Sequence, residues 1–363
     1  MSKPRLIAFY LPQFYPTKEN DEWWQKGFTE WTNVGNAKPL FRGHYQPRVP
    51  ADLGYYDLRL SEVREQQAIL AREAGIEGFC YWHYWFAGRR LLDRVFTEVV
   101  ETGKPDFPFC LCWANHSWYQ KTWDPTKPDK LLIEQTYPGL NDYIDHFNAL
   151  LPAFRDKRYL KVNGKLIFGF FSATGIKNEE FHLFKKTWND LAHKNGLKGF
   201  EFVGFTYNAS KYEEIIEKGF DKMIVDYVME MLHEKSFAKN VVKRVYRSIS
   251  GRPNKIYSYQ SYVDFALRHF SPHQNEYPCI LPNYDHSPRS AEKGYILHQS
   301  SPEKWGHYCS KVFDLYGNRN HEENIVFIKA WNEWGEGNYL EPDLRFGKGY
   351  LEELRKALDN CRD

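Results

Sequence analysis

Two glutamates three positions apart are the residues of this chain whose type and spacing best suit catalysis. Glu333 and Glu336 lie in the segment IKAWNEWGEGNYLEPD, residues 328–343, which begins as an apolar run. In a helical or 3₁₀ turn, side chains at i and i+3 share one face, with Cβ atoms about 5–6 Å apart. Glycosidases that retain anomeric configuration hold two carboxyl groups about 5–5.5 Å apart. The spacing therefore favours acid–base chemistry on a glycosidic bond over the alternative of a solvated acidic loop.

Large rings and small residues surround these two glutamates in the sequence. Trp331 and Trp334 flank Glu333, and we expect them to exclude water and to raise the pKa of one carboxyl group, as a general acid requires. Gly335 and Gly337 permit a tight turn between and after the carboxyl groups. The segment is thus predicted to be the catalytic centre.

The elements that must position this centre are eight apolar runs that alternate with helical patterns. The predicted strands are 5–11, 78–82, 107–113, 166–171, 200–206, 221–227, 279–282 and 324–330. The predicted helices are 60–74, 91–102, 141–154, 179–195, 210–218, 258–268, 302–316 and 350–360. This alternation predicts an α/β fold, a (β/α)8 TIM barrel. A doubly wound sheet is the alternative, but no G-x-G-x-x-G and no P-loop follows any predicted strand.

The barrel is predicted to be a single catalytic domain over residues 1–363 with enlarged βα loops. A long loop is expected from 12 to 58, and a basic, irregular insertion from about 229 to 257. The Lys and Arg residues of 234–255 most simply form a solvated face. A groove for an anionic polymer or a patch that faces a membrane surface is the alternative.

Aromatic and polar residues follow nearly every predicted strand, where a TIM barrel keeps its active site. Helix caps also use Asn and Asp, but capping does not explain aromatic residues at so many strand ends. The predicted substrate-binding residues are Tyr10, Trp31, Trp82, His83, Tyr84, Trp113, Asn115, Trp118, Tyr207, Asn208, Tyr227, Asn283, Asp285, Trp331, Asn332 and Trp334.

The composition agrees with a neutral ligand that has flat apolar faces. Aromatic residues make up 17 % of the chain, whereas the net charge is only +2. Because positive and negative charges are so nearly balanced, the protein has no long-range attraction to nucleic acid. We therefore do not expect nucleic acid as a partner. An oligosaccharide or polysaccharide fits the rings better.

The sequence predicts neither a cofactor nor a metal. Asp226, His286 and nearby carboxylates are candidate ligands, but no H-E-x-x-H or comparable spacing supports a metal site. The six cysteines form no C-x-x-C pair and are expected to be buried and reduced. No secretory signal and no stretch of 18 apolar residues is visible, which predicts a cytoplasmic protein without a transmembrane segment.

Four longer motifs carry a resemblance to a known family. They are FYLPQFYPTKENDEWWQKGFTEWTNV from Phe9, GHYQPRVPADLGYYD from Gly43, CWAN from Cys112 and KAWNEWGEGNYLEPD from Lys329. Over nearly its whole length the chain resembles the WbsX-like family of bacterial polysaccharide gene clusters, whose members are commonly labelled glycosyltransferases or lipopolysaccharide biosynthesis proteins. More distantly, it resembles glycoside hydrolase family 99, endo-α-1,2-mannosidases and mannanases that are (β/α)8 barrels.

The family 99 resemblance implies roles for the two glutamates. Its N-E-W-H-E-G motif matches residues 332–337 except at Gly335, which stands where the motif has His and removes a hydrogen bond to substrate. By this resemblance, Glu333 deprotonates the 2-hydroxyl of the substrate, which attacks the anomeric carbon to give a 1,2-anhydro sugar. Glu336 protonates the leaving oxygen and then activates water. The chemistry is retaining and uses no metal.

Three functions are compatible with these observations. A retaining glycoside hydrolase that acts on a bacterial polysaccharide or oligosaccharide is the first. A glycosyltransferase of O-antigen or capsule assembly is the second, although no diphosphate site is visible. A non-catalytic sugar-binding barrel is the third, but it would not need both glutamates.

Overall fold

Eight parallel strands form the centre of the molecule, seen in the computed structural model, which describes residues 2–120, 128–234, 255–272 and 275–361. The hydrogen-bonded order is β10-β9-β8-β4-β2-β1-β14-β12. Met223 of β10 and Glu276, just before β12, form a parallel bridge that brings the two ends of the sheet together. The strands are β1 Arg5–Tyr10, β2 Ile76–Phe86, β4 Phe109–Trp113, β8 Lys165–Phe170, β9 Phe200–Thr206, β10 Lys222–Val225, β12 Cys279–Ile280 and β14 Ile325–Ile328.

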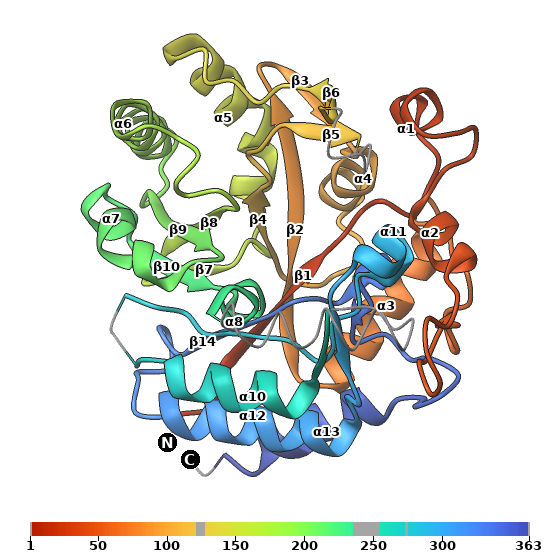
Figure 1. The fold of residues 1–363 in the computed structure, drawn as a ribbon. Helices are drawn as coiled ribbons and strands as arrows, with labels where there is room; N and C mark the ends of the chain where they lie inside the picture. Colours follow the sequence, from red (N-terminus) through yellow and green to blue (C-terminus); the bar gives the residue numbers. More distant parts are fainter. Residues whose placement is uncertain (1, 121–127, 235–254, 273–274, 362–363) are drawn as a thin grey trace.

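Helices surround these strands, as Figure 1 shows. They are α3 Ser61–Glu73, α4 Arg94–Thr102, α5 Leu140–Arg155, α6 Asn178–Lys194, α7 Tyr212–Glu217, α8 Tyr227–Glu234, α10 Tyr259–His269, α12 Pro302–Tyr316 and α13 Gly349–Asp359. The predicted (β/α)8 barrel is therefore confirmed, with all eight predicted strands present. It is a nearly closed parallel barrel with its helices outside.

The strand sequences explain why the barrel forms. Runs such as FCLCW in β4 and KMIV in β10 are buried along their whole length, as expected for parallel strands covered by helices. Inside the barrel, Phe9 of β1 stacks on Trp82 of β2, with ring centroids 4.6 Å apart. Phe9 also contacts Phe205 and Phe327. Aromatic packing thus fills the barrel below the strand ends.

Two helices interrupt the segment 12–58 that was predicted as a loop. These are α1 Lys18–Trp23, capped by the hydroxyl of Thr17, and α2 Glu30–Asn36, whose capping box pairs Thr29 with Thr32. Both are short and are stabilised by their caps rather than by a long apolar stripe, so periodicity did not reveal them. In Figure 1, α2 lies beside α11, Ser287–Ser290.

The segment around 229–257 also differs from the expectation of irregular structure. Residues 227–234 form α8, and the Asp226 side chain accepts a hydrogen bond from the Val228 amide at its start. Tyr227 therefore begins this helix and does not end a strand. Most of the basic stretch lies outside the described residues.

Short elements complete the described chain. They are β3 Arg89–Leu91, β5 Trp118–Gln120, β6 Lys130–Ile133, β7 Lys161–Val162, η1 Ala209–Lys211, β11 Ile256–Ser258, η2 Ala291–Lys293, β13 Ile296–His298, β15 Asn332–Glu333, η3 Trp334–Glu336 and β16 Asn338–Tyr339. Helices in the described part of the chain are all too short or too polar to cross a bilayer.

Candidate active site

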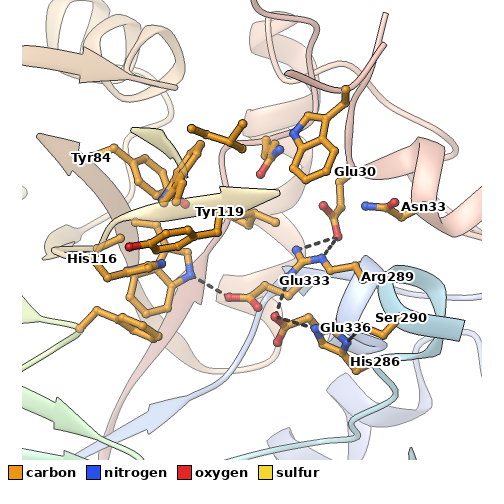
Figure 2. Close-up of a pocket in the computed structure, with 18 of the residues that line it drawn as sticks. Glu30, Asn33, Tyr84, His116, Tyr119, His286, Arg289, Ser290, Glu333 and Glu336 are labelled. Atoms are coloured by element: carbon orange, nitrogen blue, oxygen red, sulfur yellow. Dashed lines mark hydrogen bonds and ion pairs between the residues drawn. The ribbon is translucent and has the colours of Figure 1, made fainter. Parts of the chain in front are cut away.

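A cavity of about 680 Å³ opens at the carboxyl ends of the barrel strands. Segments that follow β1, β4, β8, β9 and β14 all contribute to its wall. Glu333 and Glu336 lie in it, as Figure 2 shows. The lining residues are Leu11, Gln13, Trp24, Phe28, Glu30, Asn33, Trp82, Tyr84, Ala114, His116, Ser117, Trp118, Tyr119, Leu132, Phe171, Tyr207, His286, Arg289, Ser290, Lys329, Glu333 and Glu336.

The segment that carries the two glutamates folds as a small hairpin fixed to the end of β1. Asn332 and Glu333 pair antiparallel with Asn338 and Tyr339, and the turn between them contains the expected 3₁₀ helix η3. The Asn332 amide accepts from the Leu11 N–H at 2.7 Å and donates to the Leu11 carbonyl at 3.0 Å. These bonds orient both glutamates towards the barrel mouth.

Glu336 is held as a carboxylate by three cationic or polar neighbours. Arg289 Nη1 lies 2.5 Å from Glu336 Oε1, and Lys329 Nζ lies 3.9 Å from Oε2. His286 Nε2 is 4.0 Å from Oε1. Burial alone would raise the pKa of Glu336, but attraction to Arg289 and Lys329 outweighs it and lowers the pKa to about 2. Glu336 is therefore ionised at neutral pH.

Glu333 has the opposite character. Glu333 is only 5 % exposed, and its Oε1 accepts one hydrogen bond from Trp82 Nε1 at 2.7 Å. Burial, and then the negative charge of Glu336, raise the pKa of Glu333 to about 8. Burial beside a second carboxyl group thus favours the protonated form of Glu333, whereas the adjacent cations favour the ionised form of Glu336.

A tryptophan does shield a carboxyl group, but it is not one of the two expected from the sequence. Trp331 is fully buried away from the cavity, and Trp334 stacks on Tyr339 with ring centroids 3.7 Å apart. The indole that contacts Glu333 is Trp82, which comes from β2. Sequence proximity to the glutamates was therefore a poor guide to contact.

Lys329 directly follows β14, and polar neighbours hold its side chain where it lines the cavity. Its Nζ lies 3.0 Å from Asp226 Oδ2 and 3.4 Å from the Tyr207 hydroxyl. Burial alone would lower the pKa of Lys329. Attraction to Tyr207, Asp226 and the two glutamates is stronger together and keeps the pKa well above its usual value. The ammonium group is consequently a permanent positive charge beside Glu336.

Arg289 also forms an ion pair with a second carboxylate, that of Glu30. Glu30 Oε1, from α2, accepts from Arg289 Nε at 3.0 Å and lies 2.8 Å from Nη2. Figure 2 shows Arg289 between Glu30 and Glu336, opposite Tyr84, His116 and Tyr119. This arrangement fixes the guanidinium with one nitrogen aimed at Glu336.

Glu30 also explains why residue 335 is glycine where the family 99 motif has His. A Cβ added to Gly335 would lie 1.7 Å from Glu30 Oε1, which real atoms cannot do. The space is thus filled by a carboxylate from α2, so no side chain fits at this position. The difference from the motif is a replacement of one polar group by another.

We expect Gly335→Ala to damage the site through this clash. Glu30 must move to admit the methyl group, which releases Arg289 and costs about 1–3 kcal/mol of stability. Activity assays and thermal melts of the variant should both show losses. Gly35→Ala is the matched control, because a Cβ at Gly35 meets nothing within 4 Å. A Gly335→Ala protein as active and stable as Gly35→Ala would contradict this packing.

Four of the sixteen predicted substrate-binding residues line this cavity together with both glutamates. They are Trp82, Tyr84, Trp118 and Tyr207. Their side chains are available to a ligand in the cavity, so the predicted role stays a proposal for each of them.

Two more, Asn283 and Asp285, line a different cavity. The other ten line neither: Tyr10, Trp31, His83, Trp113, Asn115, Asn208, Tyr227, Trp331, Asn332 and Trp334.

The alternation of side chains along a strand explains why some of these residues lie outside the cavities. Trp82 and Tyr84 of β2 face the cavity, so His83 between them points away and lies 2.7 Å from the ring of His146, Nε2 to Nε2. The hydroxyl of Tyr10 donates to Gln67, and that of Tyr227 donates to the His269 carbonyl. The prediction treated Trp82, His83 and Tyr84 alike, although consecutive side chains of a strand point to opposite sides.

Polar contacts within the protein account for most of the others. Asn115 binds both backbone groups of Ser172, and Asn208 caps η1. The indole nitrogens of Trp31 and Trp113 donate to main-chain carbonyls. These side chains hold the loops that form the cavity.

Sequence reasoning missed Glu30, Arg289 and Lys329 as parts of the site. Glu30 lies within the first resemblance motif, in the stretch FTEWTN, which was its available signal. Arg289 lies in YDHSPRS and Lys329 ends an apolar run, and neither has a distinctive pattern. Only the fold brings the three together.

The candidate metal ligands Asp226 and His286 contact other side chains of the protein. Asp226 binds Lys329, and His286 Nδ1 lies 2.6 Å from Ser290 Oγ. Over the described ranges, no three His, Cys, Asp or Glu side chains gather closely enough to hold an ion.

Comparisons with known proteins identify the family of this chain. Two proteins of Xanthomonas campestris pv. campestris, each named "Uncharacterized protein WxcX", are 34 % identical over 99 % of the chain. The chain spans about half the length of these curated relatives.

Two solved structures have a similar fold. A "Glycoside hydrolase-like protein" matches with a TM-score of 0.65 and 14 % identity, over 99 % of this chain and 94 % of that one. The GH99 endo-alpha-mannosidase from Bacteroides thetaiotaomicron matches with a TM-score of 0.59 and 13 % identity, over 100 % and 98 %. The sequence model of the family described as "Glycosyltransferase WbsX" matches residues 6–354. The chain therefore belongs to the WbsX family, and it has a glycoside-hydrolase-like barrel.

Proposed function

We propose that this chain is a retaining glycoside hydrolase that cleaves bonds within a bacterial polysaccharide or oligosaccharide. The observation that carries the proposal is the pair Glu333 and Glu336 in the cavity at the barrel mouth, one carboxyl group buried against Trp82 and the other paired with Arg289 and Lys329. Hydrolysis of a glycosidic bond needs one proton donor and one base or nucleophile on the same bond. The pKa values of about 8 and about 2 supply one of each at neutral pH.

The closeness of the two carboxyl groups favours retention. Each carboxyl group affects the pKa of the other, which places them close together, whereas inverting enzymes keep about 6.5–9.5 Å between theirs to admit a water molecule. A retaining route instead passes through an intermediate. In it, the 2-oxygen of the sugar itself, or a carboxylate of the enzyme, is bonded to the anomeric carbon.

The charges of the free protein suggest an order of proton transfers. Glu333 donates its proton to the glycosidic oxygen as the bond to the anomeric carbon breaks. Glu336 accepts the proton of the 2-hydroxyl, whose oxygen forms the new bond to that carbon and closes a 1,2-anhydro ring. Water then opens the ring: Glu333 takes a proton from the water, and Glu336 returns its proton to the 2-oxygen. Both residues end in their starting states.

This assignment reverses the roles that the family 99 resemblance implies, while it keeps the participation of the 2-hydroxyl from that resemblance. Arg289 and Lys329 stabilise a carboxylate at position 336, and no cation contacts Glu333 within 4 Å among the described residues. In the free protein these contacts favour a proton on Glu333, the residue to which the family 99 resemblance assigns the role of base.

Exposed rings at the rim support an oligosaccharide rather than a single sugar as substrate. Trp24 is 42 % exposed and Tyr119 is 47 % exposed, and both line the cavity. Such rings present flat apolar faces to water, which is unfavourable unless a ligand covers them. We place sugar units of the polymer against them.

Removing one such ring should weaken substrate binding and leave the chemistry intact. Trp24→Ala is expected to raise KM by about 2–10-fold, the effect of losing roughly 0.5–1.5 kcal/mol of ring contact, with kcat unchanged. Steady-state kinetics on a long oligosaccharide measure this. Tyr55→Ala, which removes a ring exposed outside the cavity, should change neither constant. An unchanged KM for Trp24→Ala would remove the ring from the binding site.

A screen of α- and β-linked oligosaccharides, including α-1,2-mannosides, tests the proposed function. We expect new reducing ends from one linkage class, detected by chromatography, with the first product anomer identical to that of the substrate by NMR. Failure to cleave any member, together with transfer of a sugar from a nucleotide donor, would overturn the proposal.

Transfer to a sugar is the second candidate, because the matched family carries the description "Glycosyltransferase WbsX". The same carboxyl pair can open the anhydro intermediate with a sugar hydroxyl in place of water, since only the acceptor of the second step changes. A nucleotide-sugar donor in the same screen distinguishes this activity from hydrolysis.

A further inference from the structure

A second cavity lies behind the wall of the candidate active site, and the proposed function does not use it. It measures about 450 Å³ and shares no lining residue with the first cavity. The segment after β12 separates the two: Asp285 lines the second cavity and His286 lines the first. Its other walls come from 42–48, which contains the GHYQPR motif, from 296–300 and from 339–350.

Three arginines line this cavity. Arg48 is only 9 % exposed, whereas Arg42 and Arg345 are exposed at the surface. Arg48 Nη1 donates to Asn283 Oδ1 at 2.9 Å and to the Gly337 carbonyl at 2.8 Å. Its Nε has no acceptor, although it is buried, and Nη2 is 3.7 Å from Asp285 Oδ2. A buried guanidinium therefore retains unused hydrogen-bonding capacity here.

The carboxylates of the cavity are already occupied by protein donors. Asp285 accepts from His44, from the Gln46 amide at 2.8 Å and from the Ser287 N–H at 3.0 Å. Asp343 accepts from the Tyr339 hydroxyl and, through its other oxygen, from two backbone amides. Neither carboxylate is left to neutralise an arginine at the surface.

His44 adds no acceptor for these arginines. Its Nδ1 accepts the Leu40 N–H at 3.1 Å, so its own proton lies on Nε2, which contacts Asp285 at 2.8 Å. Arg42 and Arg345 form no ion pair within the described part of the chain, and Arg345 lies over the Tyr45 ring at 4.9 Å. The cavity is thus lined by three arginines and by two aspartates, and both aspartates already accept hydrogen bonds from other groups of the protein.

We propose that this second cavity binds a monosaccharide-sized anion through a carboxylate or phosphate group. Arginine binds both groups with paired N–H donors, which suits an oxyanion that enters between Arg48 and the exposed pair. The volume exceeds that of an isolated ion and lies in the usual range for small ligands. The proposal stands independently of hydrolysis at Glu333 and Glu336.

Calorimetric titration of the full chain with glucuronate, glucose 6-phosphate and glucose tests this proposal. We expect saturable binding of at least one of the two anions and none of glucose. Glucuronate alone identifies a carboxylate as the ligand group, and glucose 6-phosphate alone identifies a phosphate. Failure of both anions to bind, or equal binding of glucose, would overturn the proposal.

Variants locate the binding. Arg42→Gln and Arg345→Gln are the informative ones, because Arg48 also supports the loop of Glu336 through Gly337 and its loss could unfold that loop. Each should raise the Kd of the bound anion by about tenfold or more, as expected for loss of a charged hydrogen-bond donor. Arg355→Gln, an exposed arginine of α13 outside the cavity, should leave the Kd unchanged. Wild-type affinity in both cavity variants would place the anion elsewhere.

Discussion

Glu333→Gln and Glu336→Gln are each expected to lower hydrolysis by roughly 10²–10⁴-fold, the usual contribution of a positioned acid or base. The amide keeps the shape of the side chain but can neither donate the proton required of Glu333 nor accept the one required of Glu336. Rates on the best substrate of the linkage screen, with circular dichroism to verify folding, measure the effect. Full activity in either variant would exclude the pair as the catalytic centre.

Substrates with activated leaving groups then separate the two roles. A phenol of low pKa leaves without protonation, so the variant that lacks the acid should recover on such substrates, whereas the variant that lacks the base should not. From the proton on Glu333 we expect recovery in Glu333→Gln. Recovery in Glu336→Gln instead would restore the roles implied by the family 99 resemblance. Glu62→Gln, an exposed change in α3, should behave as wild type on every substrate.

Loss of Arg289 is expected to change the pH dependence of the reaction. In the wild type, Glu336 is ionised above about pH 2 and Glu333 is protonated below about pH 8. Therefore kcat/KM should be level across the acidic range and should fall as pH rises through about 8, where the acid loses its proton. Removing Arg289 removes the main attraction that lowers the pKa of Glu336, so the acidic limb should move to higher pH.

Profiles of kcat/KM against pH for Arg289→Gln and Glu30→Gln test this account. Arg289→Gln should show the raised acidic limb and a lower maximum, because Glu30 is also left buried without its partner. Glu30→Gln retains Arg289 beside Glu336, so its acidic limb should move less. An acidic limb that stays in place without Arg289 would show that this arginine does not control the ionisation of Glu336.

The barrel was predictable because its strands are buried on both faces. Their centres, such as 202–205 and 325–328, are apolar, and turn or cap residues separate the strands from helical patterns. The i, i+3 spacing of the glutamates was equally visible, because a 3₁₀ turn depends on local sequence alone. Both features are short-range, which is why sequence reasoning reached them.

The charges of the site were not predictable, because they depend on contacts between distant segments. Glu30 and Arg289 are separated by 259 positions, and Trp82 and Glu333 by 251. The division of pKa values between two chemically identical glutamates follows from these contacts. Likewise, which of Trp82, His83 and Tyr84 faces the cavity depends on the register of β2, which is set by its neighbours in the sheet.

The most direct test of the central claim is hydrolysis of the best oligosaccharide in ¹⁸O-labelled water, followed by NMR and mass spectrometry. If Glu333 and Glu336 act as a retaining pair with water as acceptor, the label appears at the new reducing end. The first anomer detected then has the configuration of the substrate, and neither glutamine variant forms product. An inverted first product, or label-free product that forms only with a sugar acceptor, would contradict the account.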